Sequence, residues 1–264
     1  MVDCNGKDCP TESTKILGTD PNGHPPKEEW KYNSIIGMML YLAANSRPDI
    51  SFAVHLCARF THSPKRSHEQ ALLRICRYLQ ATKEEGLIYW PSDKLKVDCY
   101  CDADLAGLWS AESPNDPISV KSRAGHVIVV AGCPASWVSK LQGLIALSTL
   151  ESEYIALSTS LRELMPLQTL LKELCSNFEL PTNIPFVTHS TVYEDNNGAL
   201  RLANTQAMTP RTKHIAIIYH WFRSHVGKTI FIEKIDTKIQ TADIFTKPLG
   251  IEDFKRLRPL LCGW

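Results

Sequence analysis

Carboxylate side chains recur at four places where the sequence predicts that a strand ends or a helix begins: Asp102, Glu153, Asp195 and Asp243. Carboxylate oxygens are ligands that Mg²⁺ and Mn²⁺ prefer. Carboxylates crowded together repel one another, and bound divalent cations remove that cost. Two such ions about 3.5–4 Å apart can activate a water and stabilise the leaving oxygen of a phosphodiester. If the fold brings the four together, the chemistry that they predict is metal-assisted hydrolysis.

Each of these carboxylates also has a structural explanation when it is considered alone. Asp102 and Asp104 follow the predicted strand in "VDCYCDAD", and Asp is common in turns because its side chain bonds nearby backbone. Asp195 precedes a predicted helix and could be its N-cap. Asp243 could be an acid in a first helical turn, which the helix dipole favours. The order of the whole set along the chain is what favours a metal site.

Two glutamates compete for the second position, Glu151 and Glu153. Ser148 and Glu151 have the spacing of a capping box, in which Glu151 reaches back to the start of the helix. Glu153 has no such role and flanks the apolar stripe of that helix, so it can lean over a sheet. The spacing therefore favours Glu153 as the ligand.

Two kinds of region would have to position these residues. Apolar residues at helical spacing over 30–82 predict an all-helical unit. After it, strands are predicted over 94–102, 125–132, 134–140, 190–195 and 228–235, and helices over 147–174, 196–205, 212–226 and 241–249. Consecutive strands followed by alternating helices and strands indicate a mixed sheet covered by helices.

Composition narrows the class of protein. The 264 residues are 44% hydrophobic and 22% charged, which is typical of a globular protein with one large domain or two smaller ones. The net charge is +1, so any surface that binds nucleic acid must be local. We expect neither a membrane span nor a signal peptide. The nine cysteines are scattered without a C-x-x-C pair, which favours reduced intracellular thiols over a disulfide framework.

A series of segments resembles, in the same order, the C-terminal part of the polyprotein of copia-type LTR retrotransposons. They are "YNSIIGMMLYLAANSRPDISFAV", "YCDADLAG", "KSRAGHVIVVAGCPASWVSK", "ALSTLESEYIALS", "YEDNNGALRLA", "RTKHIAIIYHWFR" and "TADIFTKPL". In that family a ribonuclease H domain follows the reverse transcriptase. No Y-x-D-D polymerase motif occurs in the sequence, so we do not expect polymerase activity, and we expect the start at Met1 to reflect a truncation or a separate reading frame.

The resemblance implies a ribonuclease H-like α/β fold, with a five-stranded mixed sheet and flanking helices preceded by a small all-helical unit. It implies three parts: a polar tail and helical remnant of the reverse transcriptase over 1–90, a ribonuclease H-like domain over 91–250, and a C-terminal tail over 251–264. The family's catalytic, metal-binding carboxylates fall on Asp102, Glu153, Asp195 and Asp243, and "EYIA" gives Glu153 the family's E-x-x-A context. Asp104 is expected either to be a turn residue or to support the metal ligands without binding the metal itself.

The implied activity is hydrolysis of the RNA strand of RNA/DNA hybrids during reverse transcription, with two Mg²⁺ or Mn²⁺ ions as cofactors. The expected partners are the hybrid and the rest of the reverse transcriptase, and no membrane. The expected location is intracellular, either in the cytoplasm within virus-like particles or in the nucleus. Phosphate and 2′-OH contacts would hold the hybrid, and the candidate contacts, each equally open to a surface or helix-start role, are Asn197, Lys121, Arg123, Lys140, Arg211 and Lys213.

One departure from the family concerns the loop before the last carboxylate. Many ribonucleases H carry a His there that is thought to help product release, and "DTKIQTAD" has none. The alternative to an active nuclease is a catalytically inactive structural or nucleic-acid-binding remnant. The presence of all four carboxylates argues against a decayed site.

Overall fold

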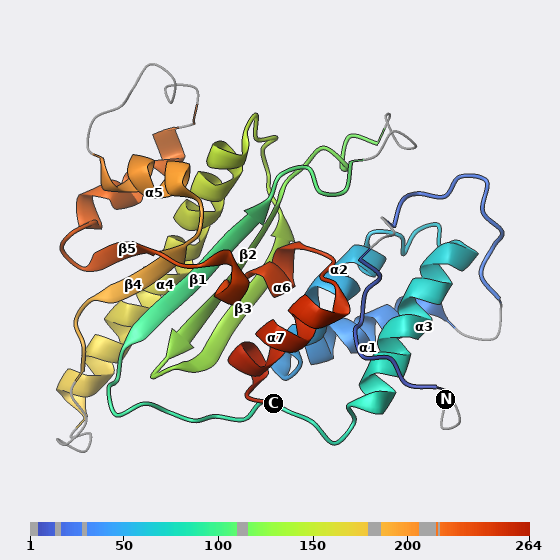
Figure 1. Ribbon diagram of the computed structural model, residues 1–264, viewed down its shortest axis with the longest axis horizontal. Coiled ribbons are helices and arrows are strands. Elements are labelled where there is room, and N and C mark those ends of the chain that lie inside the picture. Colours follow the sequence, from blue (N-terminus) through green and yellow to red (C-terminus); the bar gives the residue numbers. More distant parts are fainter. Residues whose placement is uncertain are drawn as a thin grey trace.

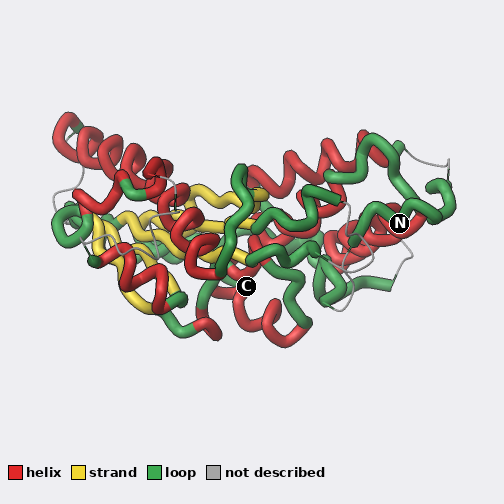
Figure 2. Tube along the Cα trace, turned by 90° about the horizontal axis from the view of Figure 1, so that it is seen from above, coloured by secondary structure: helices red, strands yellow, loops and turns green. Residues whose placement is uncertain are grey.

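The computed structural model describes residues 5–13, 17–27, 31–109, 116–178, 186–205, 215 and 217–264. A helical unit lies at one end of its long axis and a sheet with its own helices lies at the other (Figure 1). The view from above gives the same arrangement, with the strands at the end away from the N-terminus (Figure 2). No helix among these described residues has both the length and the apolar character needed to cross a membrane.

The helical unit consists of α1 (Tyr32–Asn45), the 3₁₀ helix η1 (Pro48–Ile50), α2 (Ser51–Ala58) and α3 (Arg66–Ala81). Tyr32, Ile36, Met39 and Ala43 follow one face of α1 and are buried, as expected for an apolar stripe at helical spacing. They share one apolar core with residues of α2 and α3. The all-helical unit predicted over 30–82 is confirmed.

The sheet has five strands in the order β3-β2-β1-β4-β5. The strands are β1 (Val97–Asp104), β2 (Arg123–Val130), β3 (Cys133–Leu141), β4 (Ser190–Glu194) and β5 (Ile230–Lys234). β2 pairs antiparallel with β1 and β3, whereas β4 pairs parallel with β1 and β5. The predicted five-stranded mixed sheet is confirmed, and the central strand β1 is the one that ends in Asp102 and Asp104.

Helices cover both faces of the sheet. The long helix α4 (Thr149–Asn177) packs on one face, and its apolar side chains share a core with Val97, Cys99 and Cys101 of β1. On the other face, α6 (Asp243–Thr246) and α7 (Ile251–Cys262) pack against Val127 and Tyr100. The described residues also form α5 (Asn197–Asn204) and the 3₁₀ helices η3 (Ile217–Tyr219), η4 (Trp221–His225) and η5 (Thr237–Ile239).

Two expectations about the second half of the chain are wrong. Most of residues 251–264, expected to be a tail, form α7 (Ile251–Cys262), because Phe254, Leu257 and Leu261 recur at helical spacing and are buried. Phe254 packs edge-on against Tyr78 of the helical unit at 5.6 Å between ring centroids, so α7 joins that unit to the sheet (Figure 1). The helix predicted over 212–226 is, within the described residues, the two short 3₁₀ helices η3 and η4.

Close packing of α6 on β2 depends on Gly125. A Cβ atom built on Gly125 would lie 2.6 Å from the Cβ of Phe245 and 2.7 Å from the Cγ2 of Thr246. Both atoms belong to α6, which carries Asp243 and is followed by Lys247. Gly125 therefore determines how closely α6 and Lys247 approach the end of β1.

We expect Gly125→Ala to lower the free energy of unfolding by about 1–3 kcal/mol, because overpacking forces α6 off the sheet. Gly143→Ala is the matched control, since a Cβ there meets no atom within 4 Å. Urea unfolding of both variants measures the difference. Equal stability of the two variants would show that α6 does not require the close approach.

Candidate active site

The carboxyl ends of the parallel strands β1 and β4 bring two of the predicted carboxylates together. Tyr100 pairs with Tyr193 across these strands, and continuing this register by two residues places Asp102 beside Asp195. Glu153 reaches the same point from the first turns of α4. Each of the three carboxylates offers one oxygen, and the three oxygens lie within 4.8 Å of one another. We call Asp102, Glu153 and Asp195 the carboxylate cluster.

The start of α4 separates the roles of Glu151 and Glu153. The Ser148 hydroxyl accepts a hydrogen bond from the backbone N–H of Glu151 at 3.2 Å, and the Glu151 carboxylate accepts one from the backbone N–H of Leu147 at 2.7 Å. Glu151 is thus held at the helix start, as the capping spacing predicts. Glu153 lies in the carboxylate cluster instead.

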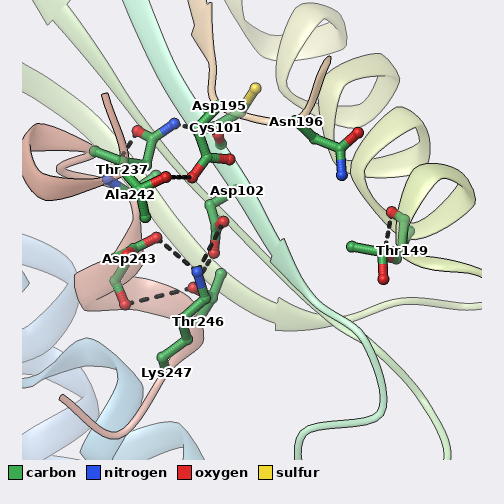
Figure 3. A network of polar contacts seen from close by, with 12 residues as sticks. Cys101, Asp102, Thr149, Asp195, Asn196, Thr237, Ala242, Asp243, Thr246 and Lys247 are labelled. Atoms are coloured by element: carbon green, nitrogen blue, oxygen red, sulfur yellow. Dashed lines mark hydrogen bonds and ion pairs between the residues drawn. The ribbon is translucent and has the colours of Figure 1, made fainter. Parts of the chain in front are cut away.

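Asp195 is not the N-cap of α5. Asn196 takes that role, because its side-chain oxygen accepts hydrogen bonds from the backbone N–H groups of Gly198 at 2.8 Å and Ala199 at 3.1 Å. Asp195 accepts a hydrogen bond from the hydroxyl of Thr237 at 2.7 Å (Figure 3). Thr237 lies in the loop that precedes Asp243, so this loop orients a cluster carboxylate.

Gln240 ties the two strand ends together below the cluster. This fully buried side chain donates hydrogen bonds to the backbone carbonyls of Cys101 at 2.9 Å and Tyr193 at 3.4 Å. These residues immediately precede Asp102 on β1 and Glu194 on β4. Gln240 could not be identified from the sequence, because a single polar residue in a loop does not indicate a bridge between two strands.

Asp243 lies next to the carboxylate cluster and is linked to it by Lys247. The Lys247 ammonium is 2.9 Å from Oδ1 of Asp243 and 3.2 Å from Oδ1 of Asp102, and the Thr246 hydroxyl donates to the other oxygen of Asp102 (Figure 3). Burial opposes the charged form of Lys247, but Asp102 and Asp243 raise its pKa. The ammonium therefore supplies positive charge between the two aspartates.

The carboxylate cluster fits a divalent cation on two observations. Asp102 and Glu153 are 0% and 4% exposed, and the Oε2 atom of Glu153 is buried without a hydrogen-bond partner among the described residues. Burial, and then the negative charge of Asp102, raise the pKa of Glu153 well above its ordinary value. A bound cation would satisfy the unpaired oxygen and remove the repulsion, and the all-oxygen donor set is the kind that Mg²⁺ and Mn²⁺ prefer.

We expect Lys247→Met to destabilise the protein in EDTA by about 1–2 kcal/mol, a value that we set below that of a fully buried pair because the lysine side chain is 33% exposed. Mg²⁺ should raise the melting temperature more in this variant than in the parent, because a cation replaces the lost charge. The exposed Lys228→Met is the control. Equal responses to Mg²⁺ in the two variants would contradict the role given to Lys247.

Asp104 lies at the end of β1, outside the carboxylate cluster, and its carboxylate lies against the following turn at Gly107. A Cβ atom on Gly107 would overlap the Asp104 carboxylate, so the glycine makes room for this side chain. Burial raises the pKa of Asp104, whereas the charge of Lys247 lowers it. Asp104 therefore lies beside the turn and within electrostatic reach of the site.

Glu194 is a further buried carboxylate that the sequence analysis missed. It is 0% exposed, accepts the backbone N–H of Asn196 at 2.9 Å, and contacts the thiol of Cys101 at 3.6 Å. Burial raises the pKa of Glu194, and the Asn196 N–H opposes that shift. Only Asp195 was expected at the site, from its place at the end of the strand and from the resemblance. The adjacent acids in "YED" were the available signal.

The predicted nucleic-acid contacts fall into three groups. Asn197 and Lys140 are exposed, at the start of α5 and on β3, and Lys121 is half-buried in the turn before β2. Arg123 is only 3% exposed and donates to the Ser139 hydroxyl at 3.1 Å, so it does not belong to the outer surface. Arg211 and Lys213 lie outside the described residues.

The amino-acid sequence is similar to those of known transposon proteins. The chain is 34% identical over 85% of its length to the retrovirus-related Pol polyprotein from transposon RE1 of Arabidopsis thaliana, and 34% identical over 87% to that from transposon TNT 1-94 of Nicotiana tabacum. It spans only 14% and 16% of the length of these relatives. No protein-family model matches the chain.

Among solved structures, the chain is similar to the N-terminal RNase H domain of a Mycobacterium tuberculosis protein, solved as a fusion with maltose-binding protein. The TM-score is 0.38 at 15% identity, and the likeness covers 58% of this chain and 91% of that one. These values are too low to carry an argument about function. The sequence relatives, each matched over most of the chain, show that it belongs to the retrovirus-related Pol polyproteins of transposons and corresponds to a part of them.

Proposed function

We propose that this chain is a metal-dependent endonuclease of the ribonuclease H type, which hydrolyses the RNA strand of RNA/DNA hybrids during reverse transcription of a copia-type retrotransposon. The observation that carries the proposal is the carboxylate cluster, in which oxygens of Asp102, Glu153 and Asp195 lie within 4.8 Å of one another at the end of β1. Membership in the Pol polyproteins of transposons supports it.

The residues that would hold two Mg²⁺ or Mn²⁺ ions are the carboxylate cluster together with Asp243. When bound, such ions supply Lewis-acid activation of a water and charge stabilisation at the departing oxygen of the phosphodiester. The chain contributes rigid placement: β1, β4 and α4 fix the cluster, and Thr246 and Thr237 each hold one carboxylate by a hydrogen bond. Preorganised groups of this kind need no rearrangement during reaction.

The hybrid would be held mainly through phosphates and 2′-OH groups, which distinguish RNA from DNA. Asn197, Lys121 and Lys140 are the predicted contacts that the structure leaves at least partly accessible. Arg211 and Lys213 stay in the proposal from the sequence resemblance. The proposal also divides the chain into a reverse-transcriptase remnant over residues 1–90 and a nuclease domain over residues 91–250. It includes an intracellular location and the rest of the reverse transcriptase as a partner.

Strand selectivity tests the proposed function. The purified chain is incubated with end-labelled RNA annealed to DNA, the same RNA annealed to RNA, and labelled DNA annealed to RNA, each with Mg²⁺, Mn²⁺ or EDTA. We expect cleavage of RNA in the hybrid alone, and only with a divalent ion. Failure to cut the hybrid with either ion would favour the inactive structural or nucleic-acid-binding remnant. Cutting of all duplexes alike would contradict the substrate.

A further inference from the structure

A groove of about 530 Å³ separates the helical unit from the edge of the sheet. α2 forms one wall, and β2 and β3 form the other. The lining residues that can carry positive charge are His55, Arg59, Arg123 and Lys140. The groove is therefore built jointly by two parts of the chain that are far apart in sequence.

Two arginines line this groove, and each has a donor that no atom of the described residues satisfies. Arg123 is 3% exposed, and its guanidinium lies 5.3 Å from the ring centroid of Phe52. The Nε atoms of both Arg123 and Arg59 are buried and have no hydrogen-bond partner within the part of the chain that the structure describes. A buried, unsatisfied donor on a charged group costs stability. An acceptor oxygen entering the groove would supply the missing partner.

The positive charge of the groove is only partly balanced. Arg59 pairs with Asp116 at 3.2 Å, and Asp104 lies opposite Arg123 in the β1–β2 register. Even so, burial and then the charge of Arg59 lower the pKa of Arg123 to about 10. Burial and then the charge of Arg123 also lower the pKa of His55. These cations repel one another, and an anion between them would relieve that repulsion.

The groove opens at the same end of the sheet as the carboxylate cluster. Arg123 pairs with Asp104 on β1 and with Leu141 on β3, and Asp104 is two residues from Asp102. Neighbouring strands are about 4.8 Å apart, whereas one turn of a nucleic-acid duplex is roughly 34 Å long. A duplex held at the cluster is long enough to reach the groove as well.

We propose that this groove binds backbone phosphates of the RNA/DNA hybrid at a distance from the cleaved bond, and that the helical unit is thereby part of the substrate-binding surface. The inference rests on the proposed function for the identity of the duplex. Arginine suits this role because its planar fork of donors matches phosphate oxygens. The helical unit then has a function of its own in a chain without a polymerase motif.

Binding of a fluorescent RNA/DNA hybrid in EDTA, at several KCl concentrations, tests the groove without cleavage. We expect the double variant Arg59→Gln, Lys140→Gln to bind roughly 10-fold more weakly, and the slope of log affinity against log salt to fall by about 0.9 per lost contact. The matched control Lys172→Gln, Lys228→Gln removes the same charge from exposed positions away from the groove, and should bind like the parent.

Because Arg59 also pairs with Asp116, the single variants His55→Glu and Lys140→Glu repeat the test at exposed positions. Groove variants that bind the hybrid like the control would overturn the inference. The inference would also be overturned if polyglutamate, an acidic peptide, bound in the groove while the groove variants bound the hybrid like the parent. Cleavage with Mg²⁺ is measured separately. Binding that depends on the groove, without any cleavage, would contradict the proposed nuclease function but not the proposed role of the groove.

Discussion

Asp102→Asn is expected to lower the rate of RNA cleavage by roughly 10³-fold or more, the scale seen when a central catalytic group is removed. Asp102 is fully buried, contributes an oxygen to the carboxylate cluster, and is approached by both Thr246 and Lys247. Asn keeps the size of the side chain and one acceptor oxygen but loses the charge. The rate is measured in single turnover with labelled hybrid and Mg²⁺.

Asp104→Asn is the matched control for this variant, two residues further along the same strand. Its carboxylate lies against the turn at Gly107 and is outside the carboxylate cluster. We expect cleavage to fall only about 10-fold, as for a residue that acts through its neighbours. If Asp104→Asn abolished cleavage and Asp102→Asn did not, the assignment of the two aspartates would be reversed.

The second large effect is expected from the glutamates of α4. Glu153→Gln should lower the cleavage rate by about 10²-fold or more, while the free energy of unfolding without metal stays the same or rises. Stability is kept because burial and then the charge of Asp102 raise the pKa of Glu153 to about 11. Without metal the side chain is therefore neutral, and Gln replaces it with a neutral group of the same size. A single-turnover assay and urea unfolding in EDTA measure the two effects.

Glu151→Ala should behave in the opposite way. Its carboxylate accepts the backbone N–H of Leu147 at the start of α4, so its loss should cost about 0.5–2 kcal/mol of stability and leave the cleavage rate per folded molecule unchanged. The contrast between Glu151 and Glu153 separates helix capping from chemistry. A cleavage defect in Glu151→Ala as large as that in Glu153→Gln would show that the two roles are not separate.

The parts of the fold that follow from local periodicity could be predicted from sequence. The apolar stripes of α1 and α4 and the alternation along β1 indicated helices, strands and their order. The choice of Glu153 over Glu151 also followed from local spacing, because capping is a contact within one helical turn. α7 had the same periodicity in Phe254, Leu257 and Leu261, and this signal was overlooked.

Long-range contacts account for what sequence did not reveal. Lys247 was one lysine among many until the fold placed it between Asp102 and Asp243. Gln240 joins two strands that are distant in sequence. Arg123 was interpreted as a surface cation, yet α2 covers it and makes it one wall of a groove. No pattern along the chain encodes such contacts, since each depends on how separate elements pack.

The central claim is that cleavage needs both a divalent ion and the carboxylate cluster. The most direct test is the rate of RNA-strand cleavage as Mg²⁺ is raised from zero, for the parent and for the triple variant Asp102→Asn, Glu153→Gln, Asp195→Asn. The account predicts a rate that rises from background and saturates in the parent, and background cleavage at every concentration in the variant. Cleavage by the parent that persists in EDTA, or equal rates for the two proteins in Mg²⁺, would contradict it.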